Sequence, residues 1–186
     1  MLILTPTKKN IQKARRILRK GGIIIYPTDT LYGLGADIFN KEAVKKVFEL
    51  KGRNFKKPTS VIVSRFSDIE KIARVNKKQA RFIQALLPGP FTIVLKKKRC
   101  VSKILTAGTR KIGIRIPEAK ICQALARNLP ITTTSANISG QRPSLNIKKL
   151  ARIFNDKVDL ILKGKNLSGK PSVVIDLTKF PPKILR

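Results

Sequence analysis

The chain contains no histidine and no tryptophan, and only ten of its 186 residues are acidic. The absence of histidine excludes a Ser-His-Asp triad, a Cys-His pair and metal sites with histidine ligands. The two cysteines, Cys100 and Cys122, form no CxxC pattern and are too few for a disulfide framework. No apolar run approaches the roughly 18–20 residues of a membrane span, and no signal-peptide pattern opens the chain. We therefore expect a cytoplasmic protein with free thiols and no membrane partner.

Acidic residues are scarce against 41 lysines and arginines, which gives a formal net charge of +31. Such a charge points first to a polyanion, such as RNA, DNA, nucleotide phosphates or an anionic membrane. A lysine- and isoleucine-rich composition can equally reflect an AT-biased genome. The charge alone therefore identifies no partner.

Helical and strand patterns alternate along the whole chain. Apolar periodicity and capping residues predict helices over 7–20, 40–51, 76–87, 118–128 and 146–154. Apolar or β-branched runs predict strands over 23–26, 60–64, 91–96, 112–116, 131–134, 158–162 and 173–177. This alternation predicts one α/β domain, residues 1–186, with a mixed sheet whose helices flank one face or both.

Polar residues follow the first buried strand directly, in the segment 26–36. Thr28 and Thr30 offer hydroxyls that can donate and accept, while Gly33 and Gly35 allow a close approach of the backbone. Ligand-binding loops gather at strand ends in α/β sheets. A ligand loop and a simple turn are equally consistent with this segment.

Three basic residues could bind an anionic ligand. Lys51 and Arg53 stand at the end of a predicted helix, where they could hold phosphate but where basic residues are also common. Arg115 alternates with Ile114 and Ile116 and so projects from the opposite sheet face. It could bind a carboxylate, or it could simply face solvent.

Hydroxyls are concentrated a second time at 132–137, where the sequence reads TTTSAN, and 140–144 follows as GQRPS. This run could bind phosphate, ribose or an amino acid, and three adjacent hydroxyls exceed what one turn needs. The sequence has no well-placed carboxylate pair, no GxxxxGK[ST] loop and no GxGxxG. Any ATP chemistry must therefore use another way to hold phosphate.

Seven motifs, in order and at matching separations, resemble those of the YrdC/Sua5 family of threonylcarbamoyl-AMP synthases. They are PT[DE]TxYGLGA at 27–36, KxR at 51–53, PGPxT at 88–92, [VI]xxRxP at 112–117, SxN at 135–137 with RPS at 142–144, PST[VI]xD at 171–176, and LR at 185–186.

The resemblance implies a YrdC-like α/β fold, a twisted mixed β-sheet with flanking helices around a concave, positively charged cavity. It implies a nucleotidyltransferase that joins ATP, L-threonine and bicarbonate or CO2 into L-threonylcarbamoyladenylate and releases pyrophosphate. The product would serve N6-threonylcarbamoyladenosine formation at tRNA position 37, completed by partner proteins of the transferase complex. The length suits the short single-domain type, without the C-terminal Sua5 domain.

Residue roles carry over by position. The pair that holds the ATP phosphates corresponds to Lys51 and Arg53, and the other nucleotide contacts correspond to Ser135, Asn137, Ser144 and Arg186. The threonine contacts correspond to Thr28, Arg115, Thr133 and Ser172. The cavity wall corresponds to Thr30 and Tyr32. The resemblance implies Mg²⁺ bound with ATP and no metal held by protein ligands.

Three positions depart from the family pattern, with Asn54 in place of Pro, Thr59 in place of Leu and Val173 in place of Thr. An alternative function stays open: a non-catalytic module that binds double-stranded RNA or tRNA, or acts in ribosome maturation. The charge of +31 motivates it, and its affinity for RNA would fall steeply with salt.

Overall fold

The computed structural model describes residues 1–52, 54–164 and 167–185. Within these ranges the helices are α1 (Lys8–Arg19), α2 (Lys41–Leu50), α3 (Phe66–Ile72), α4 (Lys77–Leu86), α5 (Lys120–Ala126) and α6 (Ile147–Ile153). The strands are β1 (Leu2–Leu4), β2 (Ile24–Pro27), β3 (Tyr32–Gly35), β4 (Ser60–Ile62), β5 (Ala73–Arg74), β6 (Phe91–Lys97), β7 (Lys111–Arg115), β8 (Ile131–Ser135), β9 (Leu160–Leu162), β10 (Val173–Asp176) and β11 (Lys183–Ile184). None of the helices in the described ranges has the length and apolar character needed to cross a bilayer.

The strands form one mixed sheet in the order β1-β9-β2-β3-β8-β4-β7-β6-β10-β11, with β5 paired to β6. The sheet contains parallel pairs, such as β4 with β7, and antiparallel pairs, such as β3 with β8. The expected mixed α/β fold is confirmed. Strands from both halves of the chain are therefore neighbours at the centre of the sheet, where β8 lies between β3 and β4.

Short polar side chains cap α1, α2, α4 and α6 as their sequence positions predict. Asn40 Oδ1 accepts a hydrogen bond from the backbone N–H of Ala43 at 3.0 Å, at the start of α2. Asn76 and Gln79 form a reciprocal capping box at the start of α4, with distances of 2.8 and 3.0 Å. These caps satisfy backbone donors that a helix start leaves unpaired.

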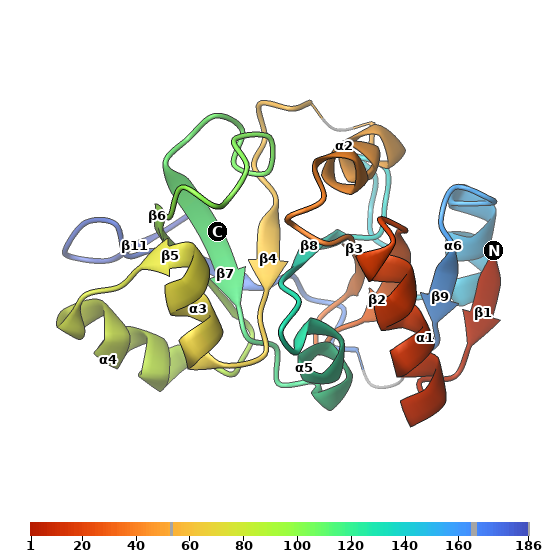
Figure 1. The fold of residues 1–186 in the computed structure, drawn as a ribbon, viewed down its shortest axis with the longest axis horizontal. Coiled ribbons are helices and arrows are strands. Elements are labelled where there is room, and N and C mark those ends of the chain that lie inside the picture. The colour runs from red at the N-terminus through yellow and green to blue at the C-terminus, as the bar shows by residue number, and fades with distance from the viewer. Residues whose placement is uncertain (53, 165–166, 186) are drawn as a thin grey trace.

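Helices cover both faces of the sheet, which settles the alternative that the sequence left open (Figure 1). In β2, Ile24 packs in one core cluster with α1 and α5, whereas Ile25 packs in another with α2 and α6. Successive strand side chains point to opposite faces. A strand buried on both faces reads as a continuous apolar run, as β2 does.

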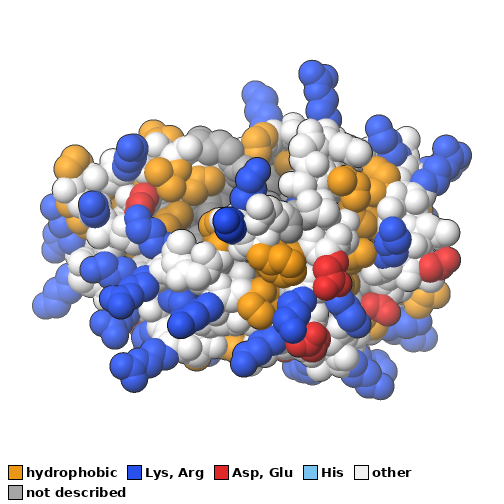
Figure 2. Space-filling view, turned by 90° about the horizontal axis from the view of Figure 1, so that it is seen from above, with side chains coloured by type: hydrophobic (Ala, Val, Ile, Leu, Met, Phe, Trp, Pro, Cys, Tyr) orange, Lys and Arg blue, Asp and Glu red, His pale blue; other side chains and the backbone are white. Residues whose placement is uncertain are grey.

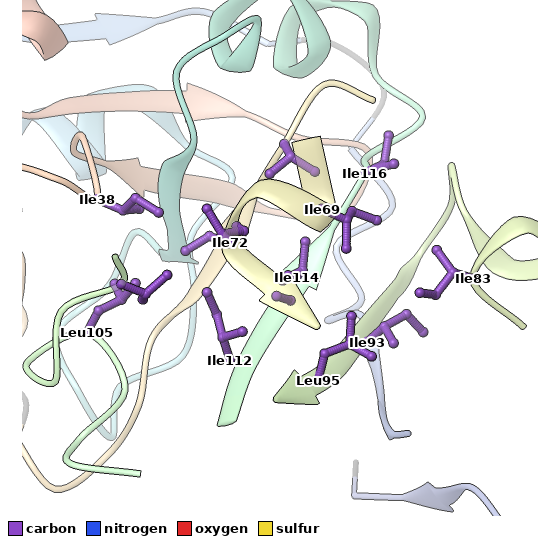
Figure 3. Packing of buried hydrophobic residues seen from close by; sticks show 14 of the residues in the cluster. Ile38, Ile69, Ile72, Ile83, Ile93, Leu95, Leu105, Ile112, Ile114 and Ile116 are labelled. Atoms are coloured by element: carbon purple, nitrogen blue, oxygen red, sulfur yellow. The ribbon is translucent and has the colours of Figure 1, made fainter. Parts of the chain in front are cut away.

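A third core cluster lies at the β6–β7 part of the sheet, where α3 and α4 pack (Figure 3). Ile69 and Ile72 of α3 are buried there with Ile112 and Ile114 of β7 and with Ile93 of β6. This packing fixes the end of β7, and therefore the backbone from which Arg115 projects.

Several elements were not predicted. The segment 32–35, expected within a ligand loop, is strand β3, and it pairs antiparallel with β2. Helix α3 and the short strands β1, β5 and β11 were also missed. Elements this short carry few residues for a periodic pattern, and the N-cap residue of α3, Arg65, makes no side-chain capping hydrogen bond.

Candidate functional site

A polar cavity of about 140 Å³ opens where the ends of β7 and β8 meet the starts of β3, β4 and β6. Most of its lining side chains carry hydroxyls. These are Thr28, Thr30, Tyr32, Thr59, Ser60, Thr92, Thr133, Thr134, Ser135 and Ser172. The walls thus come from segments that are far apart in the sequence, including the predicted 26–36, 132–137 and 171–172 segments. Pocket walls with convergent polar groups are typical of ligand sites.

Arg115 is the one basic side chain among the described residues that line this cavity. It is only 4% exposed. Its Nε donates to the carbonyl of Gly89 at 3.2 Å, Nη1 to Thr30 Oγ1 at 2.8 Å and Nη2 to Asp29 Oδ1 at 2.6 Å. The guanidinium does not face bulk solvent, so the ligand-site interpretation of this strand residue is favoured over the solvent-facing one.

The turn that connects β2 and β3 is held by its own threonines. Thr28 Oγ1 accepts hydrogen bonds from the backbone N–H groups of Thr30 and Leu31 and donates to the carbonyl of Leu31 at 2.7 Å. Since the Thr28 hydrogen is used there, Thr30 Oγ1 donates to Thr28 Oγ1, 2.9 Å away. Both hydroxyls line the cavity, and both also fix the turn that contacts Arg115.

Two buried tyrosines belong to this part of the fold, Tyr32 in the cavity wall and Tyr26 outside the lining. The Tyr32 hydroxyl accepts a hydrogen bond from the backbone N–H of Gly164 at 2.8 Å, and burial raises the pKa of Tyr32. Tyr26 donates to the carbonyl of Thr132 at 3.0 Å, and burial raises its pKa strongly. Thr30 and Tyr32, the two residues expected in a cavity wall, both line this cavity.

Ser172, which directly precedes β10, and Thr133, in β8, also line the cavity. Ser172 Oγ lies 2.8 Å from Thr92 Oγ1 of β6, the strand that pairs in parallel with β10. Thr92 belongs to the PGPxT segment, but nothing in the sequence alone assigns it a role. Ser60, which pairs with Thr133, was missed as well. In the sequence, Thr92 and Ser60 are hydroxyl residues near the start of a strand, a feature too common to indicate a ligand site by itself.

Lys51 directly follows α2 as its C-cap residue, and it is buried, with 2% of its surface exposed. Its ammonium lies 2.5 Å from the carbonyl oxygen of Ser135, 2.8 Å from that of Asn137 and 3.1 Å from Asn137 Oδ1. Its backbone carbonyl accepts from the N–H of Ser139 at 2.7 Å. Lys51 thus fixes the chain that leaves β8, and its contact with ATP phosphates stays a prediction.

Asn137 organises the same loop. Its Oδ1 accepts from Ser135 Oγ at 2.5 Å, and its Nδ2 donates to the carbonyls of Ile138 and Gln141 at 2.8 and 2.6 Å. Ser135 lines the cavity. Ser144 does not line it, and its hydroxyl instead accepts from the backbone N–H of Asn146. The roles predicted for Arg53 and Arg186 fall on positions outside the described residues.

On the face seen in Figure 2, lysine and arginine side chains are spread widely and few acidic side chains lie among them. The cavity is lined mainly by hydroxyl side chains, and among the described residues its one cation is the guanidinium of Arg115, which is paired with Asp29. In the described ranges, no group of three or more Cys, Asp and Glu side chains could hold a metal ion.

Comparison with known proteins matches this arrangement to one family. The family model Sua5_yciO_yrdC, described as telomere recombination, matches residues 16–186. The chain is 40% identical over 171 residues to a putative threonylcarbamoyl-AMP synthase of Methanocaldococcus jannaschii, covering 91% of this chain and 81% of that protein. It is 35% identical over 180 residues to the threonylcarbamoyl-AMP synthase of Pyrococcus abyssi, covering 95% of this chain.

The fold matches a solved structure as well. The P. abyssi Sua5 structure complexed with L-threonine superposes with a TM-score of 0.91 at 33% identity, covering 100% of this chain and 56% of that one. The chain spans 53% of the P. abyssi synthase, so it corresponds to about half of that longer relative.

Proposed function

This chain belongs to the Sua5/YciO/YrdC family, and from that membership we propose that it synthesises L-threonylcarbamoyladenylate from ATP, L-threonine and bicarbonate or CO2. The observation that supports this most directly is the hydroxyl-lined cavity with the guanidinium of Arg115 in its wall. An amino acid with a hydroxyl side chain offers groups complementary to both.

The Arg115 end of the cavity would hold threonine. Arginine presents two N–H groups in a plane, which suits the two oxygens of a carboxylate. Thr133 and Ser172, which line the same cavity, could receive the substrate hydroxyl or amine. A relative of known structure was solved with L-threonine bound, which agrees with this assignment.

The nucleotide would lie toward Ser135, at the opposite end of β8 from Ile131. Because β4 and β8 are antiparallel with Ser60 opposite Thr133, the chain leaving β8 lies beside the start of β4. Arg115 pairs with Ile62, two residues beyond Ser60, and Ser135 lies two residues beyond Thr133, so Arg115 and Ser135 are offset by four positions, roughly 13 Å along the strands. That separation would suit an amino acid bound at Arg115 with a phosphate of the nucleotide next to it, toward Ser135.

The reaction would proceed in two bond-forming steps. The neutral threonine amine attacks the carbon of CO2 and loses a proton, giving a carbamate. A carbamate oxygen then attacks the α-phosphorus of ATP, and the bond from that phosphorus to the β-phosphate oxygen breaks, releasing pyrophosphate. Alignment of the two substrates and stabilisation of charge are the main contributions that a protein makes to such a transfer.

ATP would enter as its Mg²⁺ complex, so the metal is part of the substrate. Lys51 and Arg53 are the proposed phosphate contacts, with Lys51 also holding the Ser135–Asn137 loop. The adenylate would pass to cytosolic transferase proteins that modify tRNA at position 37. The many surface cations could bring tRNA close (Figure 2).

A pyrophosphate-release assay tests the proposal. Pure protein is incubated with ATP and bicarbonate, with and without L-threonine, and the adenylate is identified by mass spectrometry. We expect pyrophosphate only with threonine, and Arg115→Lys should lose most of it because lysine lacks the planar fork. Folded protein that releases no threonine-dependent pyrophosphate would refute the proposal and favour a non-catalytic RNA-binding role.

A further inference from the structure

We propose that Asp29 is a positioning residue that orients the Arg115 guanidinium toward the cavity and thereby sets the affinity of the site for its amino acid. The inference rests on the proposed function, because it concerns the same carboxylate-binding end. Its basis is the ion pair between Asp29 Oδ1 and Arg115 Nη2 at 2.6 Å.

Asp29 contacts the guanidinium from outside the cavity. Its neighbours Thr28 and Thr30 line the cavity, whereas Asp29 does not. Its carboxylate lies close enough to the buried thiol of Cys122, on α5, that its charge adds to the effect of burial in raising the pKa of Cys122. The carboxylate therefore pairs with Arg115 without occupying the space of a ligand.

The contacts of Arg115 leave a fork for a ligand carboxylate. Arginine carries one N–H on Nε and two on each Nη. Described residues engage one hydrogen on each nitrogen, through Gly89, Thr30 and Asp29. One N–H therefore remains on each Nη, and two such donors can bind the two oxygens of a carboxylate.

The position of Asp29 is fixed before any ligand binds. Its backbone carbonyl accepts from the N–H of Ser168 at 3.1 Å, and the carbonyl of Thr30 accepts from Gly169 at 2.9 Å. The Thr28 hydroxyl closes the same turn from within. Because the turn is held on both sides, the entropy of ordering Arg115 is lost on folding rather than on binding.

Burial makes this pairing necessary. Asp29 supplies the one carboxylate that ion-pairs with Arg115 among the described residues, and its own side chain is 20% exposed. A buried cation without a counter-ion is strongly unfavourable. Without Asp29, the guanidinium would turn toward other acceptors or toward solvent, and the fork would no longer be aimed at the cavity.

The test measures L-threonine binding by calorimetry in the wild type, Asp29→Asn and Asp29→Ala, with ATP binding measured in parallel. Asp29→Ala should weaken threonine binding by about 10- to 100-fold, the range that loss of a group orienting a metal-binding side chain commonly costs. Asp29→Asn keeps an oxygen acceptor and the shape, so its loss should be smaller. ATP affinity should change less than threefold in both.

Asp176→Asn is the matched control. Asp176 also forms a short ion pair, 2.7 Å from Lys111, and its side chain is 13% exposed, but it does not line the cavity. Its substitution should leave threonine affinity unchanged. If it weakens threonine binding as much as Asp29→Asn does, the effect is general destabilisation and the inference is wrong.

Sodium formate separates positioning from mere stability. In Asp29→Ala, formate can occupy the vacated carboxylate position and should strengthen threonine binding, whereas sodium chloride at equal ionic strength should not. In the wild type, formate can only compete for the Arg115 fork and should weaken it. Formate that weakens binding in both proteins would overturn the inference.

The two proposals fail differently. A folded wild type that binds no threonine refutes the proposed function. A wild type that binds threonine, with Asp29→Asn and Asp29→Ala binding it equally well, refutes only the role of Asp29. If Asp29→Ala does not fold, equal threonine affinity in Asp29→Asn and the wild type still refutes it.

Discussion

The ring of Tyr26 packs against Gly35 so closely that a Cβ placed on Gly35 would lie 2.8 Å from Tyr26 Cε1. The same ring lies over Gly33, which pairs directly with Tyr26 across the β2–β3 ladder, and a Cβ there would lie 3.1 Å from Cζ. The glycines of the YGLG segment thus make room for an aromatic side chain. They allow β3 to pair with β2 beside the Tyr26 ring, next to the cavity.

Gly35→Ala should therefore destabilise the protein by about 1–3 kcal/mol, the usual cost of forcing an extra carbon into a packed core. Without such a clash, alanine is more favourable than glycine within a strand, so a loss of stability would point to the contact with Tyr26. Urea denaturation measures it. The control is the same substitution on a Tyr26→Leu background, where the shorter side chain should remove most of the added cost; an undiminished cost would mean that the ring is not the obstacle.

Sequence reasoning identified this segment but not its structure. Gly33 and Gly35 suggested a loop that lets the backbone approach a ligand, because glycine in a strand is usually unfavourable. Which side chain fills the space over a glycine depends on the cross-strand register, here Tyr26 opposite Gly33. Register is a tertiary property, and a single sequence does not display it.

Lys51 should support the nucleotide end of the cavity through the loop that it holds. Lys51→Met removes the ammonium and leaves the carbonyls of Ser135 and Asn137 without that donor. The carbonyl of Ser135 still accepts from the N–H of Asn137, so the carbonyl of Asn137 is the buried group that loses its donor, and we expect a loss of about 1–3 kcal/mol in the free energy of unfolding. ATP binding should be lost, with threonine binding largely kept.

Calorimetry with each substrate, together with urea denaturation, measures these effects. Lys45→Met is the matched control, since Lys45 is on the same helix and its side chain is 42% exposed in an ion pair with Glu42. It should be nearly neutral, as exposed ion pairs usually are. Equal effects of the two substitutions on ATP binding would mean that general loss of charge, rather than the buried contact, is responsible.

The predictability of the site differs residue by residue. The motif order placed Thr28, Arg115, Thr133 and Ser172 in one site, and all four line the cavity. The pairing of Arg115 with Asp29 was not foreseen, because 86 residues separate them and no periodic pattern joins a turn to a distant strand end. Contacts of this kind arise from sheet order, which β8 sets by joining the two halves of the chain.

Thr59 carries a hydroxyl that has no hydrogen-bond partner among the described residues, although it is buried. Removal of an unpaired buried polar group is stabilising, and Thr59→Val should raise the free energy of unfolding by about 1 kcal/mol. Thermal and urea denaturation measure the change.

Thr106 provides the matched control for Thr59. It is also buried, but its hydroxyl donates to the carbonyl of Thr109 at 2.9 Å. Thr106→Val should therefore destabilise the protein by about 1–3 kcal/mol, opposite in sign to Thr59→Val. If both substitutions destabilise the protein, the Thr59 hydroxyl has a favourable role in the folded state.

Asp176 should make the protein more sensitive to acid. Burial alone raises the pKa of its carboxyl, but hydrogen bonds from the Lys111 ammonium, at 2.7 Å, and from the Thr178 hydroxyl and N–H, at 2.6 and 2.8 Å, more than offset burial, so the pKa is lowered. The unfolded carboxyl takes up its proton near pH 3.9. The stabilisation is therefore complete above about pH 5 and is lost as the pH falls through the folded pKa.

Asp176→Asn should consequently be less stable than the wild type at pH 7, with a difference that shrinks as the pH falls from about 5 to 3. Urea denaturation at several pH values in this range, at constant ionic strength, measures the difference. Glu42→Gln is the control, because Glu42 pairs with Lys45 while its own side chain is 72% exposed, and such pairs contribute little. An Asp176→Asn difference that stays constant between pH 7 and 3 would show that the asparagine disturbs packing, and that the ion pair with Lys111 is not the source of the stability.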